Sequence, residues 1–279
     1  MTQTLEIFQS SWALELRRPD GFEWSLEEKF NRVAAAGYDG ISIDMASGNY
    51  PTAERLKPLF EQYGLANLLV AFPTTVESLN PVFDMANTLS SRFVAINAKY
   101  FPFTPQEGAQ YVRAALALAA THGVEAHFEL HRLTLTNDLF YTAQLMDLVP
   151  EMELIADLSH AVVGREIEIP IDEIHERLFF KVIDRAAGLQ GRIANREQIQ
   201  ISVTWPQHQQ WVDLFEKWWI RAMSHWRTRK GPNAILNFLC ELGPAPYAIT
   251  GADGYELVDR WEQALILKST AERLWHTST

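Results

Sequence analysis

Short apolar runs alternate with longer amphipathic segments along the chain. The runs are rich in β-branched and aromatic residues, and several follow a Gly or Pro of the kind that ends a helix, so we predict that they form β-strands. The eight runs are TLEIFQSSW, DGISIDMA, ANLLVAFP, RFVAINAKYF, VEAHFELH, MELIADLSH, LQGRIAN and AILNFLCELG. Between them, apolar residues recur at the period of a helix, as in residues 25–37, 52–64, 104–123 and 255–275.

The spacing of the runs predicts how the strands are connected. Successive runs lie mostly about thirty residues apart, which is the length of one strand, a crossover helix and the return. Eight such units in 279 residues predict a closed (β/α)8 barrel, with residues 1–279 as a single domain. A doubly wound open sheet is the alternative, but it favours a Gly-rich turn after the first strand, where this chain has ALELRRPDG.

Polar side chains cluster at the predicted strand ends, where barrel enzymes carry their catalytic groups. Alternate residues of a strand share one face, so the last four strands should direct these groups into one cavity. The residues concerned are His127, Glu129 and His131, then Asp157, then Gln190 and Arg192, then Asn237 and Glu241. The competing interpretation is structural, because an Asp at a strand end is also an ordinary helix cap and strand-end charges form salt bridges.

Three carboxylates in one cavity would repel one another. Such crowding of Glu129, Asp157 and Glu241 either raises their pKa values or recruits a cation. Further donors in the same pattern are the Gln190 amide oxygen and a nitrogen of His131 or His160. We therefore expect one divalent metal ion, and this oxygen-rich set suits Mn²⁺, Mg²⁺ or Co²⁺, with Zn²⁺ as a further candidate.

The order of these motifs resembles a known family. Glu129-Leu130-His131, Asp157-Leu158-Ser159-His160, an arginine-bearing strand and Cys240-Glu241 follow one another as in the sugar phosphate isomerase/epimerase family, which has the xylose isomerase-like barrel. The resemblance covers nearly the whole chain in strand count, helix spacing and motif order. It implies that one divalent ion is held by Glu129, Asp157, the position of Gln190, and Glu241.

The chain departs from the family pattern at two positions. Gln190-Gly191-Arg192 stands where related sequences have His-x-Arg, and Ser42 stands where many relatives have a Glu. Gln offers a neutral oxygen, which is a weaker donor to a transition metal than imidazole. The first departure therefore bears on the identity, the affinity and the presence of the metal.

The resemblance also implies a reaction. In this family the metal binds adjacent oxygens of a ketose and stabilises the enediolate that forms when a proton leaves the neighbouring carbon. Glu129 and Glu241 are implied as the pair that removes and returns the proton. We expect His160 to hydrogen-bond a substrate hydroxyl and Arg192 to hold an anionic oxygen, or Arg192 to pair with Glu129 or Asp157 in place of a weak metal.

Other residues are candidates for contact with a carbohydrate substrate. His131 follows the fifth strand, whereas His127 lies deeper and reads as a core residue. Trp12 offers an apolar wall of the sugar pocket, or core packing. Lys99 shares a face with Asn97 and is either an anion contact or, as we favour, a solvated charge at the rim.

Composition limits the partners. The formal net charge of −11 repels phosphate backbones and anionic membranes, so we expect no nucleic acid and no membrane partner. DNA-repair endonucleases with a related barrel need more metal ligands and a basic face. The single cysteine, Cys240, and the lack of a leader-like or membrane-spanning apolar stretch predict a cytoplasmic protein.

Three alternatives remain open at this level. A metal-dependent lyase or dehydratase acting on a sugar acid or cyclic polyol derivative begins with the same proton abstraction. A non-catalytic barrel with a degenerate metal site would also fit the Gln190 departure. Finally, residues 205–226 hold five of the nine tryptophans, which suggests a homo-oligomer interface or a covered active-site mouth, unless an unusually long helix packs them.

Overall fold

Eight parallel strands close into a barrel in chain order, and β1 pairs with β8. The computed structural model describes residues 2–46, 48 and 50–278, so residues 1, 47, 49 and 279 of the expected domain lie outside the described residues. The strands are β1 (Thr4–Ser10), β2 (Gly40–Asp44), β3 (Ala66–Ala71), β4 (Val94–Ile96), β5 (Ala126–Glu129), β6 (Leu154–Ala156), β7 (Ala186–Gly191) and β8 (Ile235–Cys240). The predicted (β/α)8 barrel is confirmed, and the open sheet is wrong.

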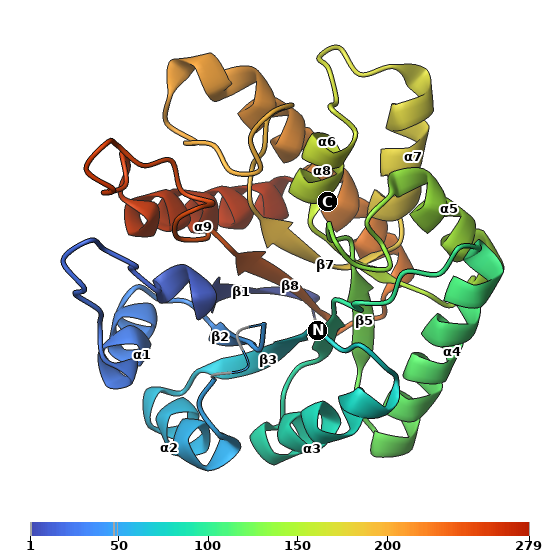
Figure 1. Cartoon of the computed structure of the whole chain (residues 1–279), viewed down its shortest axis with the longest axis horizontal. Helices are drawn as coiled ribbons and strands as arrows, with labels where there is room; N and C mark the ends of the chain where they lie inside the picture. Colours follow the sequence, from blue (N-terminus) through green and yellow to red (C-terminus); the bar gives the residue numbers. More distant parts are fainter. Residues whose placement is uncertain (1, 47, 49, 279) are drawn as a thin grey trace.

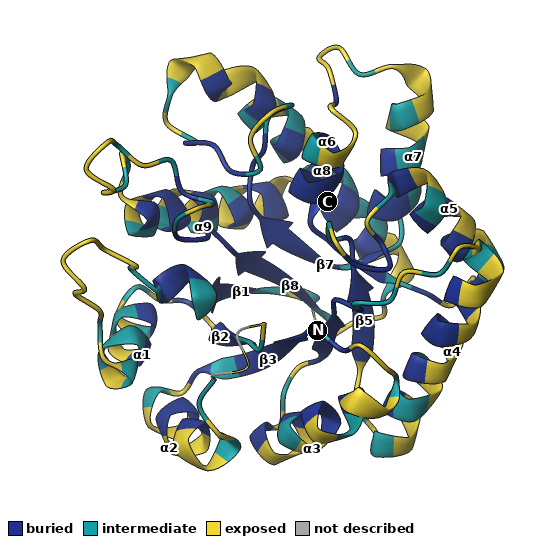
Figure 2. Ribbon diagram, in the orientation of Figure 1, coloured by how far each residue is buried: buried dark blue, intermediate teal, exposed yellow. Residues whose placement is uncertain are grey.

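The helices form a ring around the strands, as Figure 1 shows. Their exposed residues face outward and their buried residues face the barrel (Figure 2), as expected for amphipathic crossover helices. The helices are α1 (Leu26–Ala35), α2 (Ala53–Tyr63), α3 (Asn80–Leu89), α4 (Pro105–His122), α5 (Leu139–Leu148), α6 (Leu158–Gly164), α7 (Glu173–Ile183), α8 (Gln209–Arg229) and α9 (Arg260–Thr277). Among the described residues, none of these helices combines the length and apolarity that spanning a bilayer requires.

Some element boundaries differ from the predicted ones, because capping side chains set them. The segment 255–275 was predicted to be helical throughout, but α9 begins at Arg260, where the Asp259 carboxylate accepts the N–H groups of Trp261 and Glu262. Strand β7 begins at Ala186, three residues before the predicted run, and ends at Gly191. The apolar pattern gave no signal for the later start of α9, because the Asp259 cap, and not the helical period of apolar residues, sets where this helix begins.

An apolar floor fills the barrel interior below the strand ends. It consists of Phe8, Leu68, Val70, Phe93, Ala95, Ile155 and Leu239, which pack together as one cluster. Because side chains alternate along a strand, the next inward residue after each floor residue lies two positions further on. The residue after Ala95 is thus Asn97, the residue after Ile155 is Asp157, and the residue after Leu239 is Glu241. The floor therefore lifts these polar groups to the C-terminal end of the barrel.

The tryptophan-rich segment packs within the chain itself. Trp211, Trp218, Trp219 and Trp226 of α8 are all buried. Trp218 stacks on Phe179 of α7 at 4.4 Å, Trp219 meets Phe238 of β8 at 5.2 Å, and Trp226 lies 6.0 Å from Trp275 of α9, measured between ring centroids. Of the interpretations left open above, packing within the chain accounts for these four rings, because α7 and α9 cover the sides that the barrel wall leaves open.

Candidate active site

A cluster of three carboxylates lies at the C-terminal end of the barrel. Glu129 ends β5, Asp157 follows β6, and Glu241 follows β8. One carboxylate oxygen from each lies within 4.8 Å of the others, and all three side chains are buried. The inward alternation predicted from the sequence thus brings together three of the four residues implied as metal ligands.

Glu129 has little to compensate its charge. Its Oε2 accepts a hydrogen bond of 2.9 Å from the Asn97 amide nitrogen. Burial raises the pKa of Glu129 well above its usual range, and the charges of Glu241 and Asp157 raise it further. Glu129 is therefore a buried carboxyl group that readily holds a proton.

Arg192 connects the other two carboxylates. Its Nη2 lies 3.1 Å from Asp157 Oδ2 and 2.5 Å from Glu241 Oε2, and its Nε donates to Asp157 Oδ2 at 3.2 Å. The guanidinium is itself buried. Its contacts include Asp157, one of the two partners expected for it as a counter-charge; the other contact, Glu241, was not expected.

The two carboxylates respond differently to that cation. Burial alone would raise the pKa of Asp157, but the charge of Arg192 and the contacts of His160 and Ser159 more than offset burial and hold that pKa well below its usual range. Burial raises the pKa of Glu241 to about 8, and Arg192 lowers it only in part. Asp157 is therefore ionised at neutral pH, whereas Glu241 titrates near it.

Asp157 also begins helix α6. Its Oδ1 accepts the Ser159 backbone N–H at 3.1 Å, so the carboxylate caps the helix while its Oδ2 faces Arg192. The interpretation of Asp157 as a helix cap is therefore confirmed, and the same side chain also lies in the carboxylate cluster.

Gln190 is buried on β7 with no partner for its amide group. Neither its oxygen nor its nitrogen has a hydrogen-bond partner among the residues that the structure describes. An unpaired buried amide is costly, so a ligand for it is expected on physical grounds. The two residues that depart from the family pattern thus share a feature, because the Ser42 hydroxyl also has no hydrogen-bond partner among the described residues.

The two histidines lie side by side. The rings of His131 and His160 have centroids 3.9 Å apart, and Nε2 of His160 lies 3.3 Å from Asp157 Oδ2. Nδ1 of His131 faces the Arg132 carbonyl oxygen at 2.5 Å. Burial lowers the pKa of both imidazoles, and that of His131 the more strongly. The neighbouring His160 ring lowers the pKa of His131 further. Both rings are therefore neutral at physiological pH.

A cavity of about 170 Å³ opens onto this cluster. Its walls include Glu129, Glu241, His131 and Arg192, whereas Asp157, Gln190 and His160 are not among the residues that line it. The full lining is Trp12, Asp44, Ala46, Val70, Phe72, Asn97, Glu129, His131, Arg192, Glu241 and Tyr247. Pockets that bind drug-sized ligands usually have volumes of roughly 300 to 1,000 Å³. This cavity is smaller, so it suits a ligand smaller than a typical drug molecule.

Trp12 and Lys99 occupy different positions relative to the cavity. Trp12 lines it, and its ring packs against Gly243, where a Cβ would come 2.0 Å from the ring. Lys99 is not among the lining residues, since its ammonium donates to the Leu133 carbonyl at 3.1 Å and lies over the Phe72 ring.

Two lining residues with polar side chains, Asp44 and Tyr247, were missed by the sequence reasoning. Asp44 belongs to β2 and shares the inward face with Gly40 and Ser42, so the alternation within GISID could have found it. Burial raises the pKa of Asp44 to about 6. Tyr247 comes from the connection after β8, where no periodic pattern announces the direction of a side chain.

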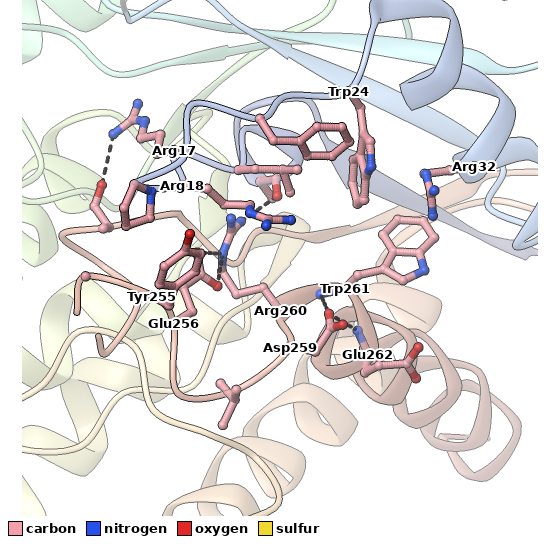
Figure 3. A pocket seen from close by; sticks show the side chains of 17 residues that line it. Arg17, Arg18, Trp24, Arg32, Tyr255, Glu256, Asp259, Arg260, Trp261 and Glu262 are labelled. Carbon is pink, nitrogen blue, oxygen red and sulfur yellow. Dashed lines mark hydrogen bonds and ion pairs between the residues drawn. The ribbon is translucent and has the colours of Figure 1, made fainter. Parts of the chain in front are cut away.

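A larger cavity, of about 490 Å³, lies between the segment after β1 and the start of α9 (Figure 3). Its labelled arginines all have partners within the chain. The ion pairs are Arg17 with Glu15, Arg18 with Asp20, Arg32 with Glu28, and Arg260 with Glu256. With its cations neutralised in this way, this cavity is a weaker candidate than the carboxylate cluster.

Comparison with known proteins supports the fold. No protein-family profile matches the sequence, and no curated protein is similar to it at the sequence level. Among solved structures, the chain is similar to a D-allulose 3-epimerase from Methylomonas sp. in complex with D-allulose, with a TM-score of 0.62, 13% identity and 97% of each chain covered. It is also similar to a xylose isomerase-like TIM barrel protein from Mycobacterium smegmatis in complex with magnesium, with a TM-score of 0.61, 13% identity and 98% of each chain covered.

A third similar structure has a different printed activity. A probable 3-DHS dehydratase from Bacillus anthracis aligns with a TM-score of 0.53 and 15% identity, over 96% of this chain and 98% of that one. At such identities these likenesses show a common fold, the xylose isomerase-like barrel, and leave the activity to be argued from the site.

Proposed function

We propose that this protein is a metal-dependent isomerase or epimerase of a small sugar or sugar derivative, which moves a proton at a carbon next to a carbonyl group. One observation carries the proposal. Glu129 and Glu241 enter the same small cavity from β5 and β8, three strands apart around the barrel, and the pKa of each is raised. Two carboxyl groups poised to exchange protons on either side of a bound carbon are what this reaction needs.

The residues present fit a divalent cation. The buried carboxylates of Glu129, Asp157 and Glu241 have oxygens within 4.8 Å of one another, and the Gln190 amide has no partner among the described residues. Oxygen donors of this kind suit Mg²⁺ or Mn²⁺. These four residues would hold the ion, which when bound would polarise the substrate carbonyl and stabilise negative charge on its oxygen.

The contacts of the two glutamates suggest which oxygen carries the proton. Oε2 of Glu129 is engaged by Asn97, and Oε2 of Glu241 is engaged by Arg192. We therefore assign proton transfer to Oε1 of each. Asn97 orients the first carboxylate, and Arg192, or the metal ion that takes its place, orients the second.

The remaining residues bind the substrate in this proposal. The neutral ring of His131 lines the cavity and can donate to or accept from a sugar hydroxyl, while the ring of His160 packs against it. Trp12 supplies an apolar wall for the carbon skeleton. Arg192 Nη1 has no partner among the described residues and can hold a substrate oxygen. Lys99 remains a candidate for an anionic group at the rim. The similar D-allulose epimerase and magnesium-bound barrel support this choice of substrate and ion.

The proposal is tested by proton exchange in heavy water. The protein is incubated with Mn²⁺ and, in turn, D-allulose, D-fructose, D-tagatose and L-ribulose, and deuterium incorporation and product formation are followed by NMR. We expect deuterium at one carbon next to the carbonyl, together with an epimer or an isomer. Glu129→Gln and Glu241→Gln should each lower this rate by roughly a hundredfold or more, because each removes a proton-transfer group.

The matched control is Glu125→Gln, directly before the start of β5 and so at the opposite end of the barrel from Glu129, where the carboxylate contacts His127. This variant should keep its activity, and circular dichroism should show all three variants folded. Loss of water in place of epimerisation would assign the site to a dehydratase. If either Glu129→Gln or Glu241→Gln keeps full activity, the assignment of the proton-transfer pair is wrong.

A further inference from the structure

Arg192 occupies the centre of the carboxylate cluster. A single nitrogen, Nη2, contacts both Asp157 Oδ2 at 3.1 Å and Glu241 Oε2 at 2.5 Å. These are two of the four residues assigned above to the metal ion. The guanidinium therefore already uses oxygens that an ion would need.

The charges show why a cation is placed there. Glu129, Asp157 and Glu241 bring carboxylate oxygens within 4.8 Å of one another, and Arg192 places a positive charge in contact with two of these groups, Asp157 and Glu241. A buried carboxylate that loses its partner is strongly destabilising, so the cluster depends on Arg192 whenever no other cation is present.

The surroundings of Arg192 allow its guanidinium to remain buried without both carboxylates. The centre of the guanidinium lies 5.0 Å from the Tyr247 ring and 5.6 Å from the Trp12 ring, both of which line the cavity. Such aromatic faces attract a cation, and arginine is the cation that stacks best on them. A guanidinium that gives up Glu241 or Asp157 would thus keep favourable neighbours.

We propose that Arg192 is the resident counter-ion of the carboxylate cluster, which stabilises the site without metal and which a divalent ion must displace from Asp157 and Glu241. The second part of this inference, displacement by a divalent ion, rests on the proposed metal site, whereas the first part, the counter-ion role, does not. It makes the metal affinity of the protein a balance between two cations for the same oxygens. A chain without this arginine should bind metal more tightly and should need metal to be stable.

The first experiment measures metal affinity. Wild type and Arg192→Met are titrated with Mn²⁺ in competition with a chelating indicator at fixed pH. We expect at least about tenfold tighter binding by Arg192→Met, since unit charges a few ångströms apart interact by more than the amount that changes a dissociation constant tenfold. Arg192→Lys, which keeps the charge but not the forked contact, should lie between the two.

The second experiment measures stability without metal. In excess chelator, Arg192→Met should unfold about 10 °C below wild type, because it leaves buried carboxylates unpaired, and Mn²⁺ should restore it. Adding Glu241→Gln to Arg192→Met should recover much of the loss without metal, and this double variant also serves if the single variant does not fold. The matched control is Arg221→Met, which removes a half-buried ion pair with Asp184 away from the cluster. It should leave the Mn²⁺ affinity unchanged and should make stability no more dependent on Mn²⁺ than in wild type.

The outcomes separate this inference from the proposed function. If wild type and Arg192→Met bind Mn²⁺ equally well, or if a folded Arg192→Met does not bind it, then Arg192 and the metal ion do not compete for the same oxygens. If no variant binds Mn²⁺, the metal part of the proposed function fails, and the counter-ion role then depends on the chelator experiment. In that experiment, an Arg192→Met protein as stable as wild type would refute it.

Discussion

The ionisation of Asp44, which lines the cavity, should make the stability of the protein depend on pH. Burial raises its pKa from 3.8 to about 6, against the hydrogen bond from Ala46 N–H. Between about pH 4 and pH 6 the folded protein thus holds a proton that the unfolded chain has released. The raised pKa means that this contribution is fully present below pH 4 and is lost as the pH rises to 6.

Asp44→Asn should remove this loss. The variant should match wild type at pH 4 and exceed its unfolding free energy by about 2 to 3 kcal/mol at pH 8, since each pKa unit corresponds to about 1.4 kcal/mol. Denaturant unfolding at the two pH values, in chelator, measures the difference. Asp213→Asn, on the exposed face of α8, controls for the change in net charge. A variant no more stable than wild type at pH 8 would show that Asp44 ionises without cost.

The candidate residues differ in how far the sequence could predict them. The inward positions of Glu129 and Glu241 follow from a period of two along a strand, which the sequence displays directly. The contact of Arg192 with both Asp157 and Glu241 does not, because a long side chain reaches its partners through several torsions that no pattern encodes. Tyr247 was missed for a similar reason, since it lies in an irregular connection.

At the scale of elements, strand order was predictable and helix packing was not. The eight apolar runs and their spacing identify the strands, because parallel strands buried on both faces read as continuous apolar stretches. The burial of the α8 tryptophans depends on how α7 and α9 sit beside it, which is a property of the assembled ring. A large number of apolar residues on one helix therefore does not show whether the helix forms an interface with another chain or packs inside its own chain.

The packing of α8 leads to a prediction about stability. Trp219 is 1% exposed and lies among Phe215 and Phe238, so Trp219→Ala should cost about 3 to 5 kcal/mol of unfolding free energy. Trp205, before the helix, is half-buried and stacks on His208, so Trp205→Ala should cost much less. Urea unfolding of both variants provides the comparison. Similar losses in the two would mean that α8 is not anchored through Trp219.

At the scale of the molecule, the proposed metal ligands come from four consecutive strands. Glu129 and Gln190 lie on β5 and β7, and Asp157 and Glu241 directly follow β6 and β8; these four strands form half of the barrel wall. An ion that binds only the folded chain stabilises it by about 2.7 kcal/mol at a hundred times its dissociation constant. For a chain of this size that corresponds to a rise of very roughly 5 to 10 °C in Tm, so metal binding should be visible as thermal stability of the whole protein.

Gln190→His tests whether the β7 position contributes to that linkage. Imidazole is a better donor to transition metals than an amide oxygen, so the variant should reach a given rise in Tm at lower Mn²⁺ or Zn²⁺ concentration, with the larger gain for Zn²⁺. The measurement is Tm against metal concentration after chelator treatment. Gln198→His makes the same change at an exposed position in the connection after β7 and should leave the curves unchanged. If Gln190→His behaves like this control while wild type still responds to metal, the ion is held by the carboxylates alone, and the unpartnered amide of Gln190 then serves the substrate instead.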